Sequence, residues 1–382
     1  MLRKIAARTA IGLGFGIAIG LASPIDAAQW PNIPADGPQW PDLSAAGSRA
    51  ADDALTTGAT LDAKPLPQPP PLFEPRPAPL RFVEKAEPAF SGELGIRYWF
   101  SWSQSAKDLY GISGEYLVSR LTYESMTGHS AELFGRFAHN NGFYLKTYLG
   151  GGWLDGGRLI DEDFPPVIAP YSNTVSEQRA GTLAYGAVDF GYNLFERSNV
   201  RLGAFAGYHF LMERMNVFGC AQAASNTAVC GGGGVPDSVE VIAQNNTWHS
   251  LRVGLDAELR LSKRIALSAD AAYLPYVRLV GTDRHFLRIG TAPGDFAGGI
   301  PEDGKGWGYQ FEVALSYAVS ENVKFAIGGR YWHMETDGHA HFEGNVVGVN
   351  ALPQPLDWQT DHYGIFVQGS FNFGPYPTGA LY

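Results

Sequence analysis

Residues 251–261 read LRVGLDAELRL, and this stretch decides the fold. Apolar residues occupy every second position of it. The positions between are mostly charged: Arg252, Asp256, Glu258 and Arg260. Successive side chains of a β-strand point to opposite faces, so the stretch predicts a strand with one apolar face and one charged face. The same alternation recurs over residues 309–319 and 363–373.

Ten strands of this kind are predicted along the chain. Their ranges are 92–104, 116–138, 143–154, 179–194, 200–218, 246–261, 265–285, 307–319, 323–337 and 359–373. Strands of soluble sheets usually have about five or six residues. Most of these run past about ten, the length that a tilted strand needs to cross a membrane.

The connections between the predicted strands alternate in length. The short ones are HNNG (139–142), FERSN (195–199), SKR (262–264) and SEN (320–322), and the long ones are 105–115, 155–178, 219–245, 286–306 and 338–358. Short turns at one end and long loops at the other are typical of outer-membrane barrels, with the turns in the periplasm. A closed barrel also satisfies every backbone group inside lipid. The sequence therefore predicts an all-β, ten-stranded antiparallel transmembrane β-barrel over residues 92–373.

The rest of the chain is predicted to lie outside the barrel. Residues 1–28 begin with a basic stretch and continue with an apolar one, which predicts a secretory signal peptide. Residues 29–91 are interpreted as a periplasmic linker, because 12 of the 25 prolines fall within 29–80. Residues 374–382 form a C-terminal extension. No further segment has about 18 consecutive apolar residues, which excludes a helical membrane protein.

Composition narrows the function further. The net charge of −10 argues against nucleic-acid binding. Outer-membrane lipid is expected to surround the predicted barrel. A ten-stranded barrel has a narrow lumen, and inward charges would fill it, so a general porin is disfavoured. Cys220 and Cys230 are expected to pair in an oxidising compartment, with two free thiols as the alternative.

Two short acidic motifs are candidates for chemistry. Asp161 and Asp163 lie in the second long loop, within IDEDF. Asp283 and His285 lie at the end of the seventh strand, within DRH, and both motifs are expected at the extracellular end. A histidine beside a carboxylate can take a proton from water, and opposing carboxylates can hold that water. A solvated loop or a cation site is the alternative. Alternation from Ile265 would aim the second pair at lipid, so a bulge is required, and Pro275 is a plausible place for it.

In order and content these strands and motifs resemble the omptins, the ten-stranded outer-membrane proteases of Gram-negative bacteria, over residues 92–373. The resemblance rests on IDEDF after the third strand, DRH at the end of the seventh, and RLGAFAGYHF (201–210) in the fifth. It implies an endopeptidase at the cell surface, with a polypeptide substrate, water as nucleophile and no metal. Asp283 and His285 would activate the water, and Asp161 and Asp163 would position it.

The chain also departs from the omptin pattern. Ser103 and Gly281 occupy the places of the acidic residues that hold a basic substrate side chain, so dibasic specificity is not implied. The resemblance implies that lipopolysaccharide is required for activity and that no cofactor is needed. The residues proposed to bind it are Tyr208, Glu213 and Arg214, the last two through a bulge.

Other interpretations stay open. Histidines and carboxylates alternate from His333 to His341, where zinc binding is the alternative to a polar loop top, and no metal is expected. The barrel as a whole could instead be a non-enzymatic surface protein serving adhesion or anchoring. A small-solute channel is a third possibility, which the inward charges disfavour.

Overall fold

The structure, a computed structural model, describes residues 89–292, 294–343 and 352–374. The predicted signal peptide lies outside the described residues, as do nearly all of the Pro-rich linker and the C-terminal extension. No helix within the described ranges is long and apolar enough to cross a membrane.

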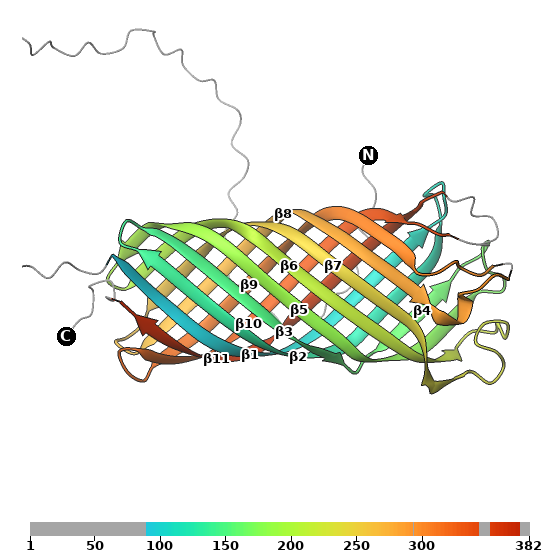
Figure 1. Cartoon of the computed structure of the whole chain (residues 1–382), viewed down its shortest axis with the longest axis horizontal. Helices are drawn as coiled ribbons and strands as arrows, with labels where there is room; N and C mark the ends of the chain where they lie inside the picture. The colour runs from blue at the N-terminus through green and yellow to red at the C-terminus, as the bar shows by residue number, and fades with distance from the viewer. Residues whose placement is uncertain (1–88, 293, 344–351, 375–382) are drawn as a thin grey trace, which may run out of the picture. The chain divides into compact units, whose positions relative to one another are not determined.

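The described part of the chain consists of long strands and one 3-10 turn, and Figure 1 shows them in order. The strands are β1 (Phe90–Tyr110), β2 (Leu117–His139), β3 (Phe143–Asp155), β4 (Arg158–Asp163), β5 (Ser172–Arg197), β6 (Val200–Gln222), β7 (Val235–Arg260), β8 (Ile265–His285), β9 (Ile300–Ala318), β10 (Val323–Ala340) and β11 (Gln354–Phe373); η1 is Phe286–Arg288.

The strands form a closed antiparallel ring. Apart from β3 and β4, which do not pair with each other, strands that are neighbours in sequence are paired, and β1 also pairs with β11, which closes the barrel. Strands β3 and β4 share the third position, because both pair with β2 on one side and β5 on the other. The eleven strands therefore occupy ten positions in the wall, and the predicted fold class is confirmed.

Two glycines separate β3 from β4. Gly156 and Gly157 have φ of 68° and 95°, in the left-handed region that favours glycine. A Cβ on Gly157 would lie 2.7 Å from the carbonyl oxygen of Glu124 in β2. The wall therefore bends at this point and then continues as β4, with Glu124 paired to Arg158.

The outer surface carries the apolar band that the alternation predicted. Leu251, Val253 and Leu255 of β7 are 52%, 44% and 51% exposed, while Arg252 and Asp256 are buried inside. Aromatic side chains on the outer wall, among them Trp102, Trp153, Tyr208, Tyr276, Trp307 and Tyr363, lie at the end of this band away from the short turns. Such a band fits a bilayer, with the aromatic residues at its interface.

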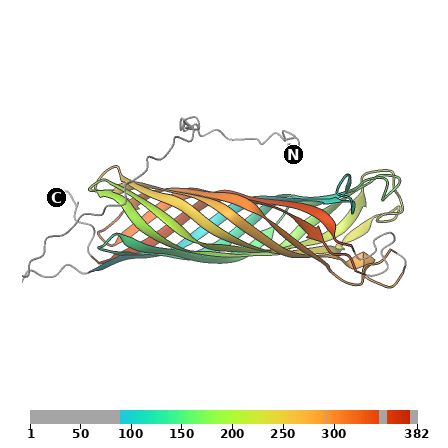
Figure 2. The ribbon, with the colours of Figure 1, turned by 90° about the horizontal axis from the view of Figure 1, so that it is seen from above.

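The strands are longer than predicted and the loops correspondingly shorter. Strand β7 begins at Val235, eleven residues before the predicted start at Asn246, and β5 begins at Ser172 instead of Arg179. The four short turns are confirmed, and they lie at one end of the barrel while β4 and the longer loops lie at the other (Figures 1 and 2). The wall therefore extends past the apolar band on the loop side.

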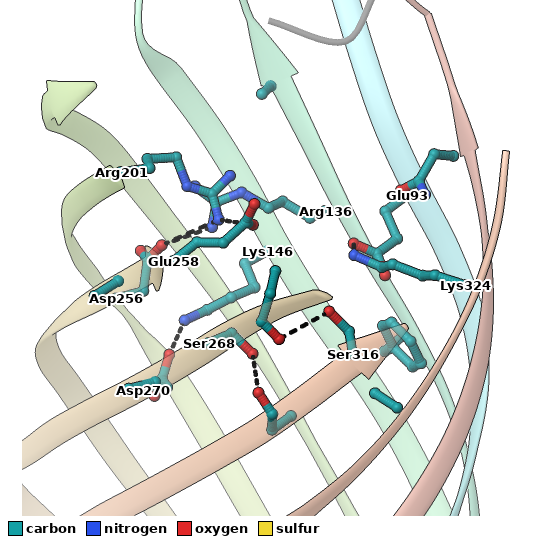
Figure 3. A pocket seen from close by; sticks show the side chains of 18 of the residues that line it. Glu93, Arg136, Lys146, Arg201, Asp256, Glu258, Ser268, Asp270, Ser316 and Lys324 are labelled. Atoms are coloured by element: carbon teal, nitrogen blue, oxygen red, sulfur yellow. Dashed lines mark hydrogen bonds and ion pairs between the residues drawn. The ribbon is translucent and has the colours of Figure 1, made fainter. Parts of the chain in front are cut away.

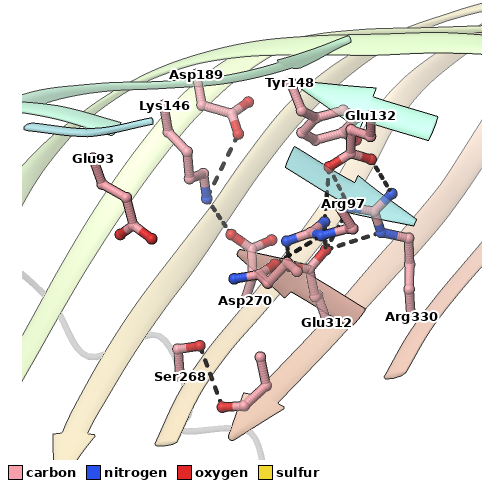
Figure 4. Close-up of polar contacts among 12 residues, drawn as sticks. Glu93, Arg97, Glu132, Lys146, Tyr148, Asp189, Ser268, Asp270, Glu312 and Arg330 are labelled. Atoms are coloured by element: carbon pink, nitrogen blue, oxygen red, sulfur yellow. Dashed lines mark hydrogen bonds and ion pairs between the residues drawn. The ribbon is translucent and has the colours of Figure 1, made fainter. Parts of the chain in front are cut away.

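A plug of charged and aromatic side chains closes the lumen at mid-height. Arg330 lies between Glu132 and Glu312, with nitrogen–oxygen distances of 2.7 Å to each. Arg97 bridges the same two carboxylates at 2.9 and 2.8 Å, as Figure 4 shows. The rings of Trp99, Tyr148 and Trp332 lie about 5 Å from the Arg330 guanidinium. A buried, paired cation with aromatic faces around it therefore occupies the lumen at this level.

A cavity of about 680 Å³ lies between the plug and the short turns. Its charges form ion pairs. Arg136 with Asp256 and Lys146 with Asp270 join distant strands, whereas Arg201 pairs with Glu258 on the adjacent strand and Lys324 pairs with Glu93 across one intervening strand (Figures 3 and 4). The prediction that paired charges fill the interior is therefore borne out by these contacts. These ion pairs balance one another's charges, so no bound ligand is needed to explain the charged side chains named here.

The plug predicts an electrically silent barrel. Purified protein reconstituted in planar bilayers is expected to show no stable single-channel conductance, because Arg97, Arg330 and their carboxylates block the lumen. Recordings from a large porin under the same conditions provide the positive control. Stable conductance steps from the wild-type barrel would contradict a closed lumen.

Candidate functional site

A bulge in β8 aims Asp283 and His285 into the barrel. Before it, odd-numbered residues such as Tyr273 are exposed; after it, odd-numbered residues such as Leu279 are buried. The register shifts between Leu274 and Val277 against β9, which places the extra residue at Pro275–Tyr276. The bulge expected near Pro275 is therefore confirmed, and it brings the Asp–x–His motif to the lumen side.

Asp161 and Asp163 lie on a strand, and the prediction that they lie in a loop was wrong. They are paired in β4 with Leu121 and Ser119 of β2. They share the inward face of β4 with Leu159, which is 1% exposed. The strand continues here because β2 and β5 both extend far enough to supply backbone partners on either side.

The Asp283–His285 pair is already hydrogen bonded. His285 Nε2 lies 2.9 Å from Asp283 Oδ2. A neutral ring that donates through Nε2 keeps Nδ1 as its basic nitrogen, so the carboxylate orients the ring for accepting a proton. The edge of Phe296 packs on the imidazole, with ring centroids 5.8 Å apart.

This site lies outside the membrane-spanning segments. Arg278 of β8 and Lys305 of β9 are paired in register and both exposed, and these charges end the apolar band on the two strands. Asp283 follows Tyr276 by seven residues. That is about 23 Å along an extended strand at about 3.3 Å per residue. The site is therefore at the rim on the long-loop side.

The two motifs act on each other across the rim. Burial and the charge of Asp163 raise the pKa of Asp161 to about 7, and His285, Asp283 and Lys107 also act on it. Burial likewise raises the pKa of Asp163, against opposing effects of Ser119, Arg288 and His285. The four predicted residues therefore form one electrostatic site.

In the Asp283–His285 pair, unlike in Asp161 and Asp163, the pKa shifts favour the charged forms. Burial disfavours both charged forms, but each partner outweighs it: the pKa of Asp283 is lowered and that of His285 is raised. Asp161 and Asp283 each keep a buried Oδ1 without a hydrogen-bond partner among the described residues. Those oxygens can accept hydrogen bonds from a water or a substrate amide.

Sequence reasoning missed three polar residues of this site. Lys107 Nζ lies 2.5 Å from Asp283 Oδ2, 2.7 Å from Glu302 Oε1 and 2.9 Å from Gln244 Oε1. The three residues that the prediction missed, Lys107, Glu302 and Gln244, are buried inside the barrel. The signal was available, because Arg97, Trp99 and Ser101 point inward and the same parity continues to Lys107. The predicted strand ends at residue 104, three residues before Lys107, whereas β1 continues to Tyr110.

The two positions expected to lack acidic groups both lie inside the barrel, and Gly281 lies beside this cluster. Ser103 is buried, with no hydrogen-bond partner for its hydroxyl among the described residues. A Cβ on Gly281 would lie 2.9 Å from Asn246 Oδ1 and 3.4 Å from Glu302 Oε2. Glu302 is therefore the carboxylate at this place, and it already contacts Lys107.

The predicted lipopolysaccharide residues do not share one surface. Glu213 points into the barrel, where Trp248 Nε1 donates to it at 2.9 Å and His362 Nε2 lies 2.8 Å from it. The expected bulge is absent between Tyr208 and Arg214, because exposed and buried residues alternate without interruption there. Tyr208 and Arg214 face outward, and Glu213 is corrected to a core residue.

The cysteine prediction is confirmed, because Cys220 and Cys230 form a disulfide with Cα atoms 5.9 Å apart.

The histidines between His333 and His341 make separate contacts. His333 Nδ1 lies 2.9 Å from Asp361, and His341 Nε2 lies 2.7 Å from Asp303. Within the described ranges, no group of three or more potential ligands is arranged to hold a metal ion.

Comparison with known proteins supports the fold. No protein-family model matches the sequence, and no curated protein matches it. Among solved structures the chain is similar to the outer membrane protease OmpT from Escherichia coli, with a TM-score of 0.58 and 15% identity over 74% of this chain and 97% of that one.

Two other solved barrels show weaker similarity. The outer membrane protein OprG from Pseudomonas aeruginosa has a TM-score of 0.30 and 9% identity, covering 74% of this chain and 97% of that one. Ail, the attachment invasion locus protein of Yersinia pestis, in complex with a heparin analogue, has a TM-score of 0.25 and 10% identity, covering 74% and 99%. What the chain shares with OmpT is the fold of an outer-membrane β-barrel.

Proposed function

We propose that the chain is an omptin-like endopeptidase of the outer membrane that cleaves polypeptides with an activated water. The observation that carries the proposal is the meeting of two inward acidic motifs at one rim. Asp161 and Asp163 come from β4, and the hydrogen-bonded Asp283–His285 pair comes from β8. A histidine oriented by one carboxylate and opposed by others has the composition of a water-activating site.

Three of the four groups have a definite role in the proposed reaction. His285 takes a proton from water through Nδ1, and the resulting hydroxide attacks the scissile carbonyl carbon. The pKa of Asp161, about 7, leaves a share of it protonated near neutral pH, so that it can donate a hydrogen bond to the oxyanion. When the carbon–nitrogen bond breaks, the imidazolium returns the proton to the leaving amine. Asp283 keeps the ring oriented and stabilises its charged form.

The surroundings of the site support a surface location. The four residues lie beyond the apolar band at the end opposite the short turns, which is the extracellular end in the usual barrel orientation. The proposed substrate is therefore an extracellular polypeptide. Lipopolysaccharide is proposed as the activating lipid on the outer wall, near Tyr208 and Arg214.

The proposed specificity is not for basic residues. Ser103 and Gly281 supply no carboxylate, and Glu302 beside Gly281 is bonded to Lys107. A substrate guanidinium would have to displace that lysine to find a bidentate partner. Neutral side chains fit this surface without such displacement.

A peptide-library assay tests the proposal. Refolded protein with lipopolysaccharide is expected to cleave part of a mixed library, at sites not dominated by basic residues. Asp161→Ala should lose cleavage, because it removes the group that holds the water and the oxyanion. Asp155→Ala is the matched control, since Asp155 is exposed at the end of β3.

Two outcomes would count against the proposal. Retained cleavage by Asp161→Ala would show that the site is assigned incorrectly. No cleavage by folded, lipopolysaccharide-loaded wild type would favour the non-enzymatic surface barrel.

A further inference from the structure

Lys107 is a buried cation at the centre of the candidate site. It lies near the end of β1, and its side chain is 4% exposed. Three strands separate β1 from β8 on one side of the ring, so the lysine reaches across the lumen to contact Asp283. A long charged side chain in this position is costly unless every bond of its ammonium group is satisfied.

All three bonds of the ammonium group are satisfied within the barrel. Asp283 Oδ2, Glu302 Oε1 and Gln244 Oε1 accept them at 2.5, 2.7 and 2.9 Å. Gln244 is fixed in turn, because its Nε2 donates to Glu302 Oε2 at 2.8 Å and to Asn246 Oδ1 at 2.8 Å. The lysine is therefore held from β7, β8 and β9 at once, and no free bond remains for a substrate anion.

One oxygen links the lysine to the histidine. Asp283 Oδ2 lies 2.5 Å from Lys107 Nζ and 2.9 Å from His285 Nε2. Asp283 Oδ1 has no partner among the described residues. The orientation of the carboxylate is thus defined by these two contacts. Loss of the lysine contact would leave His285 as the group that fixes Asp283, and would free the carboxylate to rotate.

We infer that Lys107, held by Glu302 and Gln244, is a positioning residue that fixes Asp283 for His285, an inference that rests on the proposed function. Lys107 does not touch the water or the substrate in this role. It acts through Asp283, and Glu302 supplies the charge that allows an ammonium group to be buried there. Two buried carboxylates around one lysine are more stable with it than without it.

The charge of Lys107 also bears on the titration of His285. The groups that face the imidazole and its lysine neighbour are Asp283, Asp161, Asp163, Arg288, Glu302, Tyr123 and Gln244. Burial lowers the pKa of His285 and Asp283 raises it, while Lys107 opposes that rise. Removal of the lysine charge should therefore move the titration of His285 to higher pH.

The test uses two variants and a matched control. Lys107→Met removes the ammonium group with little change in volume, but leaves Asp283 and Glu302 buried without it. The double variant Lys107→Met, Glu302→Gln keeps the net charge of the wild type and protects the measurement if the single variant fails to fold. Lys305→Met is the control, because Lys305 is an exposed lysine of β9.

The primary readout is the titration of His285, followed by NMR of isotope-labelled histidine in refolded protein. In Lys107→Met it should rise by about half a pH unit or more, as expected for loss of a nearby cation. In the double variant the rise should be smaller, because the negative charge of Glu302 is lost together with the lysine. The control should match the wild type. Peptide cleavage should show a lower kcat/KM with its acid limb displaced in the same direction, whereas a purely structural lysine would lower activity without displacing the limb.

An unchanged His285 titration in both Lys107 variants would overturn the inference, whether or not the protein cleaves peptides. Failure of the proposed function would appear differently. The wild type would then be inactive on every peptide, while the response of the His285 titration to Lys107 would still report whether the two groups are linked.

Discussion

Replacing His285 with asparagine is expected to lower kcat/KM for peptide cleavage by about 10²- to 10⁴-fold, the usual contribution of a general base. Asparagine preserves the approximate size and a polar contact to Asp283 but cannot take a proton from water. The measurement is the initial rate of cleavage of the best library peptide. His129→Asn is the control, since His129 is paired with Tyr98 on the outer wall at 2.6 Å.

The pH dependence of the wild-type rate follows from the same residue. Only neutral His285 can act as the base, and its pKa lies above the ordinary value because the charge of Asp283 outweighs the effect of burial. The rate should therefore rise with pH through that raised pKa, so that the acid limb lies above about pH 6.5, the ordinary histidine value. A limb well below that value, or an active His285→Asn variant, would exclude His285 as the base.

Asp161→Asn is expected to stabilise the folded barrel at alkaline pH. Burial and the neighbouring Asp163 raise the pKa of Asp161 to about 7, so its ionised form is disfavoured in the folded state. The protonated carboxyl stabilises the fold at low pH, and this contribution is lost as the pH rises through about 7. Asparagine cannot ionise and avoids that loss, by an amount on the order of a few kcal/mol.

The apparent midpoint of thermal unfolding in detergent measures this effect. Asp161→Asn should unfold at a higher temperature than the wild type at about pH 8.5, and at nearly the same temperature at about pH 4, where both side chains are neutral. Asp155→Asn, at an exposed position, should follow the wild type at both pH values. Equal stability of Asp161→Asn and wild type at alkaline pH would mean that Asp161 ionises without cost.

The sequence predicts the membrane-spanning part of the barrel well, because lipid imposes the pattern. Within the bilayer, every outward side chain of β7 must be apolar, so Leu251, Val253 and Leu255 identify the strand and its orientation. Beyond the bilayer both faces meet water or protein, and the alternation of polarity weakens. The prediction therefore missed the first eleven residues of β7, and all of β4.

The site residues show the same division. The predicted bulge that turns Asp283 and His285 away from lipid is confirmed, because Pro275 gives a local reason for it. Glu213 was assigned to the outer wall on the assumption of a second bulge, and β6 has none between Tyr208 and Arg214. Lys107 carries no motif, so its role depends on partners from β8 and β9 that are distant in sequence.

The plug at Arg330 has a consequence for traffic across the membrane. Since Arg97, Glu132 and Glu312 close the lumen around it, polypeptide reaching the rim can leave only through the mouth by which it entered. Cleavage at the rim would release the fragments outside the cell and import none of them. Any nutritional use of the fragments would require a separate transporter. The same barrier separates the proposed protease site from periplasmic proteins, so the proposed activity would not require a zymogen or an inhibitor.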